Sequence, residues 1–327
     1  MGVTASAPAK TILLGEHFVV YGEPAIVLAI NKRVNATVDL REDKRIYFHS
    51  STLNLSGYFE DGKFSIEDGD IIEARSKFDP LRFAVEKVLE TYGQKVGLNF
   101  KINSSVPVSA GLGSSAAVAT AVITAADSLL NLKMSKQEIF RISYETEKIV
   151  HGNPSGIDPA ISTFGGTMLF QKDTGFQPID VKTDIPLIVG YTGVTRSTGL
   201  QIAKVKNLKE RYPEIIQPMM NIGRKIVLKA LDALKKGRLN ILGDLMNINH
   251  ALLCGLGVSH ESLELLINEA RKNGALGAKL TGGGGGGCMI ALAEDDKIPL
   301  VLEALSKTGG KPFVAKKTDE GVKIEKK

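Results

Sequence analysis

The sequence predicts an α+β protein with two domains, and three observations lead to this fold class. The chain has 327 residues, which is more than one hydrophobic core usually serves. Turn residues divide its first third into short, closely spaced apolar segments that are typical of strands. After Asp184, helical and strand patterns alternate. We place the domain boundary near Asp184, which gives domains of residues 1–184 and 185–327.

The N-terminal domain is expected to combine a sheet with helices. Apolar runs between glycine-containing turns predict strands at residues 11–14, 18–21, 25–29, 35–40 and 45–49, and their close spacing favours antiparallel pairing. The segment DPLRFAVEKVLETYG, residues 79–93, is typical of a helix with an aspartate cap, and GLNFKINSSVPV returns to a strand. An alanine-rich helix from Ser114 follows, and then a helix from Ser135 to about residue 150, which opens with the capping-box sequence SKQE.

The C-terminal domain is expected to be a small α+β sandwich that begins with the strand LIVGYTG. The periodicity then predicts helices at residues 217–235, 239–253 and 262–273. After a run of six glycines come the strand CMIALA, a helix near residues 298–306 and a strand at 311–315. The closing segment KKTDEGVKIEKK is predicted to be a last strand with a charged end.

Composition and charge exclude several classes of protein. The formal charge of +5 is spread along the chain, without the basic block that a nucleic-acid-binding arm would need. Cys254 and Cys288 lie far apart, with no CxxC and no His pair at metal spacing, which argues against a disulfide framework and against a zinc site. Because the chain lacks a signal peptide and a long apolar run, we expect a soluble, cytoplasmic protein that does not bind membranes.

A candidate phosphate-binding loop precedes the alanine-rich helix. Gly111, Gly113, Ser114 and Ser115 bring small residues to a helix N-terminus, where unpaired N–H groups and the helix dipole attract anions. An ordinary helix cap is the alternative interpretation. The stretch also fits the dinucleotide pattern G-x-G-x-x-A, but a helix follows this helix where a dinucleotide fold needs a parallel strand with a terminal acid.

Candidate catalytic residues occur in two other segments. In ETEKIVHGNPSGIDP, glycines and prolines stiffen a loop that presents Asp158, a carboxylate suited to act as a base or metal ligand, although it could simply cap a turn. Near the start, PAKTILLGEH places Lys10, Glu16 and His17 around one apolar strand and its turn. Arg196, after the first strand of the second domain, is a candidate clamp for a substrate carboxylate or an ordinary surface residue.

Three motifs, in this order, resemble those of the GHMP kinase family, the galacto-, homoserine, mevalonate and phosphomevalonate kinases. They are PAKTILLGEH, PVSAGLGSSAA and KLTGGGGGGC, and the resemblance covers essentially the whole chain. Within the family, HGNPSGIDPAISTFGG and LLGEHFVVYGEPAI are most similar to the members that phosphorylate mevalonate. The resemblance implies an N-terminal mixed sheet with helices, a C-terminal ferredoxin-like sandwich and an active site in the cleft between them.

The resemblance also implies roles for individual residues. Asp158 matches the family's catalytic aspartate and Lys10 its partner lysine, whereas Glu16 and His17 match positions that contact mevalonate. A loop serine and a helix glutamate hold Mg²⁺, which we assign to Ser115 and Glu147, with Ser114 less favoured. The loop around the ATP phosphates would comprise Pro107, Val108, Ser109, Ala110, Gly111, Leu112, Gly113, Ser114, Ser115, Ala116 and Ala117. The glycine run would shape the site by letting two backbones meet, at Gly282, Gly283, Gly284, Gly285, Gly286 and Gly287.

The function implied is ATP-dependent phosphorylation of the C5 hydroxyl of mevalonate, with Mg²⁺ as cofactor, in isoprenoid biosynthesis. Asp158 would accept the hydroxyl proton and Lys10 would stabilise the developing negative charge. Phosphomevalonate kinase, mevalonate-3-kinase and diphosphomevalonate decarboxylase are alternatives with the same fold. A nicotinamide oxidoreductase and a non-catalytic ATP-binding module are alternatives from other classes. The sequence does not decide the oligomeric state, for which a homodimer is one candidate.

Overall fold

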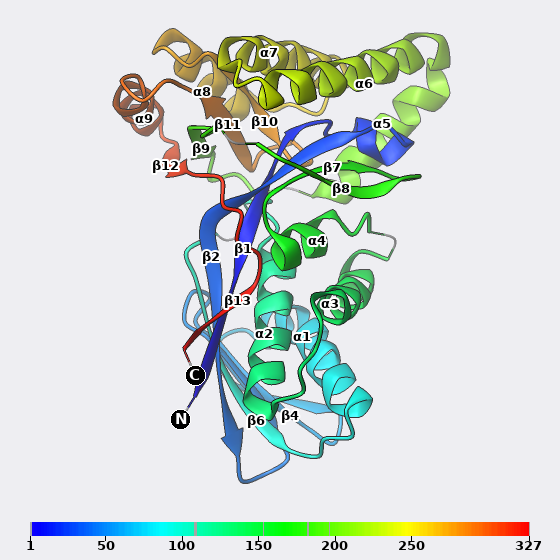
Figure 1. Ribbon diagram of the computed structural model, residues 1–327, viewed down its shortest axis with the longest axis vertical. Coiled ribbons are helices and arrows are strands. Elements are labelled where there is room, and N and C mark those ends of the chain that lie inside the picture. Colours follow the sequence, from blue (N-terminus) through cyan, green and yellow to red (C-terminus); the bar gives the residue numbers. More distant parts are fainter. Residues whose placement is uncertain (1, 108–109, 153, 182, 196, 327) are drawn as a thin grey trace.

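The computed structural model describes residues 2–107, 110–152, 154–181, 183–195 and 197–326, and its α+β architecture contains two sheets (Figure 1). The larger sheet has nine strands, in the order β13-β1-β2-β6-β3-β4-β5, with β7 also paired to β2 and β8 paired to β7. These strands are β1 (Val3–Leu14), β2 (Ala25–Arg41), β3 (Ile46–Ser50), β4 (Leu55–Glu60), β5 (Lys63–Asp68), β6 (Gly97–Ser104), β7 (Thr167–Gln171), β8 (Gly175–Ile179) and β13 (Lys323–Lys326).

The strands of the larger sheet pair mostly antiparallel. The exception is β3 with β6, which run parallel with Phe48 opposite Phe100, so the sheet is mixed. These two rings stack at 5.3 Å between centroids in the hydrophobic core. The mixed sheet therefore agrees with the expected fold, whereas purely antiparallel pairing is wrong for this one pair.

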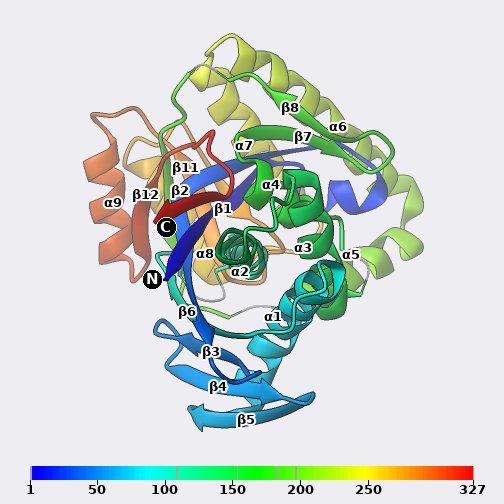
Figure 2. The same cartoon turned by 60° about the horizontal axis from the view of Figure 1, so that its bottom comes forward.

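Four helices pack around one another beside this sheet, with the alanine-rich helix at their centre. They are α1 (Ile71–Thr91), α2 (Ser114–Leu130), α3 (Lys136–His151) and α4 (Ile157–Phe164). Figure 2, which looks nearly along α2, shows the other three helices and β1 around it. Because α2 is apolar on almost all sides, it can be buried, and its small side chains let β1 and β2 approach closely. This contact brings the start of α2 to the end of β1.

The smaller sheet has four antiparallel strands in the order β10-β11-β9-β12. Its strands are β9 (Leu187–Tyr191), β10 (Gly277–Thr281), β11 (Cys288–Leu292) and β12 (Lys311–Ala315), and the helices of this half are α5 (Thr198–Arg211), α6 (Pro213–Lys235), α7 (Leu239–Gly255), α8 (Glu261–Lys272) and α9 (Ile298–Lys307). Helices separate β9 from β10 and β11 from β12, which is the ferredoxin-like connection order. The α+β prediction for the C-terminal half is thus confirmed.

Some elements differ from the sequence prediction. The segment Phe18–Tyr21 is not a strand but a short 3-10 helix, η1, because its Phe18 side chain packs against Gly223 of α6. The strands expected at 25–29 and 35–40 are one long strand, β2. Helix α1 begins at Ile71 with Asp70 as its cap, so Pro80 lies within the helix and not at its start. None of the elements β4, β5, α4, β7, β8, α5 and β10 was predicted from the sequence.

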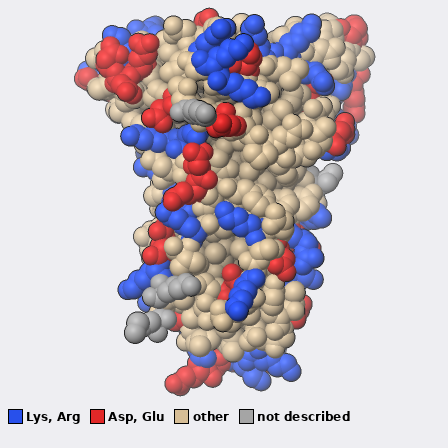
Figure 3. Space-filling model, in the orientation of Figure 1, with Lys and Arg blue, Asp and Glu red and all other residues tan. Residues whose placement is uncertain are grey.

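The two halves are joined through shared packing. One core cluster contains Phe48 and Phe100 of the larger sheet together with Ile290 of the smaller one. The last strand, β13, returns to the larger sheet and pairs with β1, where Ser6 lies opposite Lys323. In the space-filling view, Lys and Arg side chains are interspersed with Asp and Glu over the face shown (Figure 3). Among the described residues, no helix combines the length and the apolar character that crossing a membrane requires.

Candidate active site

Strand β1 positions the predicted lysine. Lys10 lies near the end of this strand with only 5% of its surface exposed, and its backbone N–H donates to the carbonyl of Leu112 at 2.9 Å. That hydrogen bond holds the candidate phosphate loop against β1. The Lys10 ammonium Nζ is 3.0 Å from Oδ1 of Asp158, so two residues separated by almost 150 positions form an ion pair.

Asp158 lies in the first turn of α4, at the end of the stiff loop that the sequence indicates. The helix is preceded by Gly156, which has a left-handed conformation with φ of 78°. A side chain at that position would also meet the ring of Tyr144, 3.1 Å from the position of a Cβ atom. Glycine therefore allows α4 to begin close to α3, which directs Asp158 towards Lys10.

The N-terminus of α2 meets this ion pair. Gly113, with φ of 73°, immediately precedes the helix, and a Cβ atom there would lie 2.8 Å from Cγ of Lys10 and 3.3 Å from Oδ2 of Asp158. Only glycine fits this backbone conformation and this space without strain. The first N–H groups of α2 have no intrahelical partner, so an anion-binding helix end adjoins a lysine and an aspartate. The structure thus brings Lys10, Asp158 and Gly113 together.

Glu147 completes the acidic part of this site from α3. Burial, followed by the charge of nearby Asp158, raises the pKa of Glu147 to about 8, and Lys10 only partly opposes the shift. Within the described residues, its buried Oε2 atom has no hydrogen-bond partner. A buried carboxylate oxygen that lacks a partner and lies near a second carboxylate fits a hard divalent cation. The candidate hydroxyl ligands occupy the first two positions of α2, with Ser114 partly buried and Ser115 exposed.

Glu16 and His17 are also buried, and each has an internal partner. The Glu16 carboxylate contacts the ammonium of Lys279 on β10, and Asn249 of α7 donates to it at 3.5 Å. Burial raises the pKa of Glu16 and lowers that of Lys279, while the contact between them opposes both shifts. The ring of His17 is 2.8 Å from the carbonyl oxygen of Gly283, so it touches the glycine run.

Sequence reasoning missed Lys279 and Asn249. Lys279 is fully buried in a strand with no other charged residue, and it lies two positions before the threonine that precedes the glycines. A lysine inside an apolar strand is itself a signal, because a buried ammonium needs a carboxylate partner. The sequence could not say that this partner would be Glu16, some 260 residues away. Asn249 gives no comparable signal, since it lies in an ordinary helical pattern.

The glycine run lies where separate backbones approach one another. At Gly284 a Cβ atom would be 2.1 Å from the carbonyl oxygen of Val258, and at Gly286 it would be 2.9 Å from a side-chain carbon of Val194. The N–H of Gly285 donates to Val258 at 2.8 Å, and that of Gly287 donates to Val194 at 3.0 Å. The sequence therefore uses glycine here for close approach. The backbones that it meets belong to the α7–α8 connection and to the segment after β9.

Strand β1 connects this region with the Lys10 site. The hydroxyl of Thr281, which precedes the glycine run, donates to the carbonyl of Ile12 at 2.9 Å and lies 3.1 Å from the hydroxyl of Thr11. The segment after β1 then contributes Glu16 and His17 to the contacts with Lys279 and Gly283. One short stretch of chain, residues 10–17, therefore links the site around Lys10 and Asp158 with the contacts that Glu16 and His17 make. Three predicted residues, Val108, Ser109 and Arg196, lie outside the described residues.

Two family models match the chain. The model described as "GHMP kinases N terminal domain" matches residues 80–166, and "GHMP kinases C terminal" matches residues 230–311. Among similar curated proteins, a mevalonate kinase of Pyrococcus horikoshii is 42% identical over 331 residues, covering 99% of this chain and 98% of that protein. A mevalonate kinase of Pyrococcus furiosus is 43% identical, with 99% of both chains covered.

Solved structures show the same likeness. The structure of L. major mevalonate kinase in complex with R-mevalonate has a TM-score of 0.84 and 28% identity, covering 97% of this chain and 96% of that one. The structure of Methanococcus jannaschii mevalonate kinase has a TM-score of 0.83 and 26% identity, covering 96% of this chain and 98% of that one. The likeness extends over both sheets and their helices.

Proposed function

Because the chain belongs to the GHMP kinase family, we propose that it transfers the γ-phosphoryl group of ATP to the C5 hydroxyl of mevalonate, giving 5-phosphomevalonate. The observation that carries this proposal is the Lys10–Asp158 contact of 3.0 Å beside Gly113 at the start of α2. A base, a cation and an anion-binding helix end are the parts that phosphoryl transfer needs, since catalysis consists mainly of positioning and charge neutralisation.

In this mechanism, each part of the site has a separate role. The N–H groups at the start of α2 bind phosphate oxygens through the loop of residues 107–117. Asp158 accepts the proton of the attacking hydroxyl, and the Lys10 ammonium stabilises negative charge that develops there. Glu16 and His17 are proposed to orient mevalonate, with Lys279 holding Glu16 in place. Arg196 is proposed to bind the mevalonate carboxylate.

Mg²⁺ fits the acidic part of the site. Glu147 would hold it together with the hydroxyl of Ser115, and Ser114 is the second candidate. A buried carboxylate oxygen without a hydrogen-bond partner supports this assignment. When bound, the ion would neutralise charge on the β- and γ-phosphates. Carboxylate and hydroxyl oxygens are the ligands that Mg²⁺ prefers.

Three further proposals rest on this function. The first is a division into domains of residues 1–184 and 185–327, with the substrates bound in a cleft between them. The second is a cytoplasmic location, where ATP is supplied. The third concerns assembly, for which a homodimer is the candidate that analytical ultracentrifugation of the purified protein would test.

The test is a coupled ADP assay of the purified chain with mevalonate, 5-phosphomevalonate and the diphosphate as separate acceptors. We expect turnover with mevalonate only, and ³¹P NMR of the product should show a phosphate ester at C5 and not at C3. The variant Asp158→Ala should lose several decades of turnover. Its control is Asp173→Ala, an exposed aspartate in the turn between β7 and β8, which should keep wild-type activity.

Other outcomes would point to other functions. Turnover with a phosphorylated acceptor would assign a different GHMP kinase reaction, and release of carbon dioxide would assign the decarboxylase. A nucleotide-dependent change in nicotinamide absorbance would indicate an oxidoreductase. ATP binding without turnover of any acceptor would indicate a non-catalytic ATP-binding module. Near wild-type activity of Asp158→Ala would refute its proposed role.

A further inference from the structure

A cluster of three different ligand types lies between α7 and α8, and none of its residues has a role in the phosphoryl transfer proposed above. His250 and Cys254 are four residues apart on α7, so their side chains share one face of the helix. Glu264, in the first turn of α8, faces them from the other side of the α7–α8 connection. His250 is only 2% exposed, so its ring is fixed by packing.

The three ligand atoms form a tight triangle. Nε2 of His250 is 3.0 Å from Oε1 of Glu264, Sγ of Cys254 is 3.2 Å from the same oxygen, and Sγ is 3.5 Å from Nε2. A tetrahedral zinc ion, with bonds of about 2.0–2.3 Å, sets its ligand atoms roughly 3.3–3.6 Å apart. The triangle therefore needs to expand by only a few tenths of an ångström to accept such an ion.

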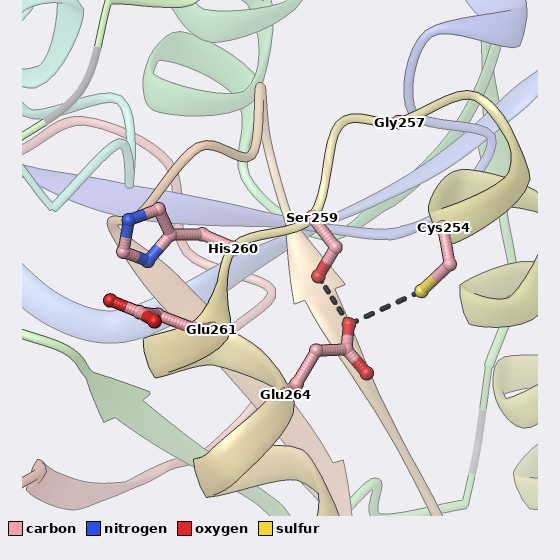
Figure 4. Close-up of a pocket in the computed structure, with 6 residues that line it drawn as sticks. All are labelled: Cys254, Gly257, Ser259, His260, Glu261 and Glu264. Atoms are coloured by element: carbon pink, nitrogen blue, oxygen red, sulfur yellow. Dashed lines mark hydrogen bonds between the residues drawn. The ribbon is translucent and has the colours of Figure 1, made fainter.

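The triangle adjoins a cavity of about 320 Å³, lined by Cys254, Gly257, Ser259, His260, Glu261 and Glu264. Figure 4 shows Cys254 and Ser259 both pointing at the carboxylate of Glu264, while His260 lies to one side next to Glu261. None of these residues is a predicted part of the phosphoryl-transfer site. The cavity gives an ion an entry path and leaves room for a fourth ligand such as water.

We propose that His250, Cys254 and Glu264 form a binding site for a divalent transition-metal ion of the zinc type, with its fourth coordination position facing the cavity. Imidazole, thiolate and carboxylate together are typical zinc ligands, whereas Mg²⁺ does not favour sulfur or nitrogen ligands. The hydroxyl of Ser259 contacts Glu264 and would orient that carboxylate from outside the ligand set.

The protonation state of the histidine supports this assignment. Burial lowers the pKa of His250 to about 4, so at neutral pH the ring is neutral and donates its Nε2–H to the Glu264 carboxylate, and the contact is not an ion pair. A metal ion at Nε2 needs the lone pair of that nitrogen, so on binding the ring proton would move to Nδ1, a buried atom that has no hydrogen-bond partner among the described residues. Burial and the contact with Glu264 raise the pKa of the Cys254 thiol to about 11, so a metal ion would bind there by displacing the thiol proton.

The expectation that the chain has no zinc site rested only on CxxC and His–His pairs, and so passed over the mixed pair His250 and Cys254. Here two ligands come from one helix and the third from the next. An ion at this position would tie α7 to α8 across their connection, whose Val258 accepts a hydrogen bond from Gly285 of the glycine run. Metal binding should therefore stabilise the loop that packs against that run.

The experiment uses Co²⁺ as a spectroscopic probe on the full chain, first treated with a chelator. We expect one Co²⁺ per chain to give a thiolate-to-cobalt charge-transfer absorption, which Zn²⁺ abolishes by displacement and excess Mg²⁺ does not. Because a cobalt ion bound by Glu147 would have no sulfur ligand, this band reports only a cysteine site. The melting temperature should rise when Zn²⁺ is added.

Variants and controls assign the ligands. Cys254→Ser should remove the band, and Glu264→Gln should weaken Co²⁺ binding about tenfold or more. The matched control Glu261→Gln, on the same helix and lining the same cavity, should bind Co²⁺ as the wild type does, as should Cys288→Ser. Circular dichroism of each variant checks that it is folded. A second measurement avoids substitution altogether: Zn²⁺ should slow alkylation of Cys254 in the wild type, as followed by peptide mapping.

Three results would overturn the proposal. They are the absence of a thiolate band at one equivalent of Co²⁺, a band that survives in folded Cys254→Ser, and an alkylation rate of Cys254 that Zn²⁺ leaves unchanged. Mevalonate phosphorylation does not enter any of these measurements, so their failure leaves the proposed kinase activity untouched.

Discussion

The substitution Gly113→Ala tests the central geometry of the proposed site. Its Cβ atom would lie 2.8 Å from Cγ and 3.2 Å from Cε of Lys10, and 3.3 Å from Oδ2 of Asp158. Real Cβ atoms essentially never come within 3.0 Å of a heavy atom from a residue that is not their neighbour in the chain, so the lysine stem must move. Since the residue also has φ of 73°, alanine there adds a backbone strain of about 1–2 kcal/mol.

The two effects can be separated with a matched control. Gly93, after α1, has φ of 64°, but a Cβ atom there would meet nothing within 4 Å. Gly93→Ala therefore carries the same backbone strain without displacing any side chain. We expect both variants to lower the melting temperature, Gly113→Ala by more because it also displaces the buried stem of Lys10. Only Gly113→Ala should lower kcat/KM, by about a hundredfold, because a displacement of about 1 Å at a reacting group costs this much.

The assay is steady-state kinetics with mevalonate and ATP for the wild type and both variants, beside thermal unfolding of each. Equal kcat/KM values for Gly113→Ala and the wild type would refute the reasoning, because the contact with Lys10 and Asp158 would then have no part in the reaction. A hundredfold loss in Gly93→Ala would refute it as well, since strain alone would explain the effect.

The remaining predictions concern buried charge. Glu147→Gln should raise the Mg²⁺ concentration needed for half-maximal activity at least tenfold, and a titration at saturating ATP measures this; an unchanged requirement would exclude Glu147 as a ligand. Lys279→Met should destabilise the fold by about 3–5 kcal/mol, because it leaves Glu16 buried without its partner, and the double variant Lys279→Met/Glu16→Gln should recover much of that loss in urea unfolding. Since burial lowers the pKa of His250 from 6.5 to about 4, the unfolded chain takes up its proton first as pH falls. The stability that the neutral His250 ring contributes is therefore present above about pH 6.5 and is lost as pH falls towards 4. In chelator-treated protein, His250→Gln should flatten the fall in stability over that window, and an equally steep fall would contradict this.

Local patterns in the sequence predicted the fold well where the periodicity was strong. The capping box at Ser135 is present with both of its hydrogen bonds, and α2 begins at Ser114 as predicted. The helix start near Asp79 is wrong because Pro80 resembles a first-turn proline, while the true cap is Asp70. The segment at Phe18 reads as a strand locally, but contact with α6 determines its conformation, and a local pattern does not contain that contact.

The candidate site was predictable only where a local motif marks its residues. Motif resemblance pointed to Lys10 and Asp158, and the geometry pairs them. Glu16 pairs with Lys279 because the fold brings β10 beside the end of β1. The spacing of residues in the sequence does not predict this contact. The same holds for His250 and Glu264, which belong to different helices.

The pairing of β13 with β1 has a consequence for the order of events on the ribosome. Strand β1 carries the lysine of the proposed site and is made more than 300 residues before the strand that covers its outer edge, which contains residues 323–326. The sheet edge beside Ser6 thus stays open until nearly all of these residues have been synthesised, and its closure joins positions more than 300 residues apart. Such a late, long-range step favours slow completion of the native state and gives chaperones that recognise open strand edges a defined interval in which to act.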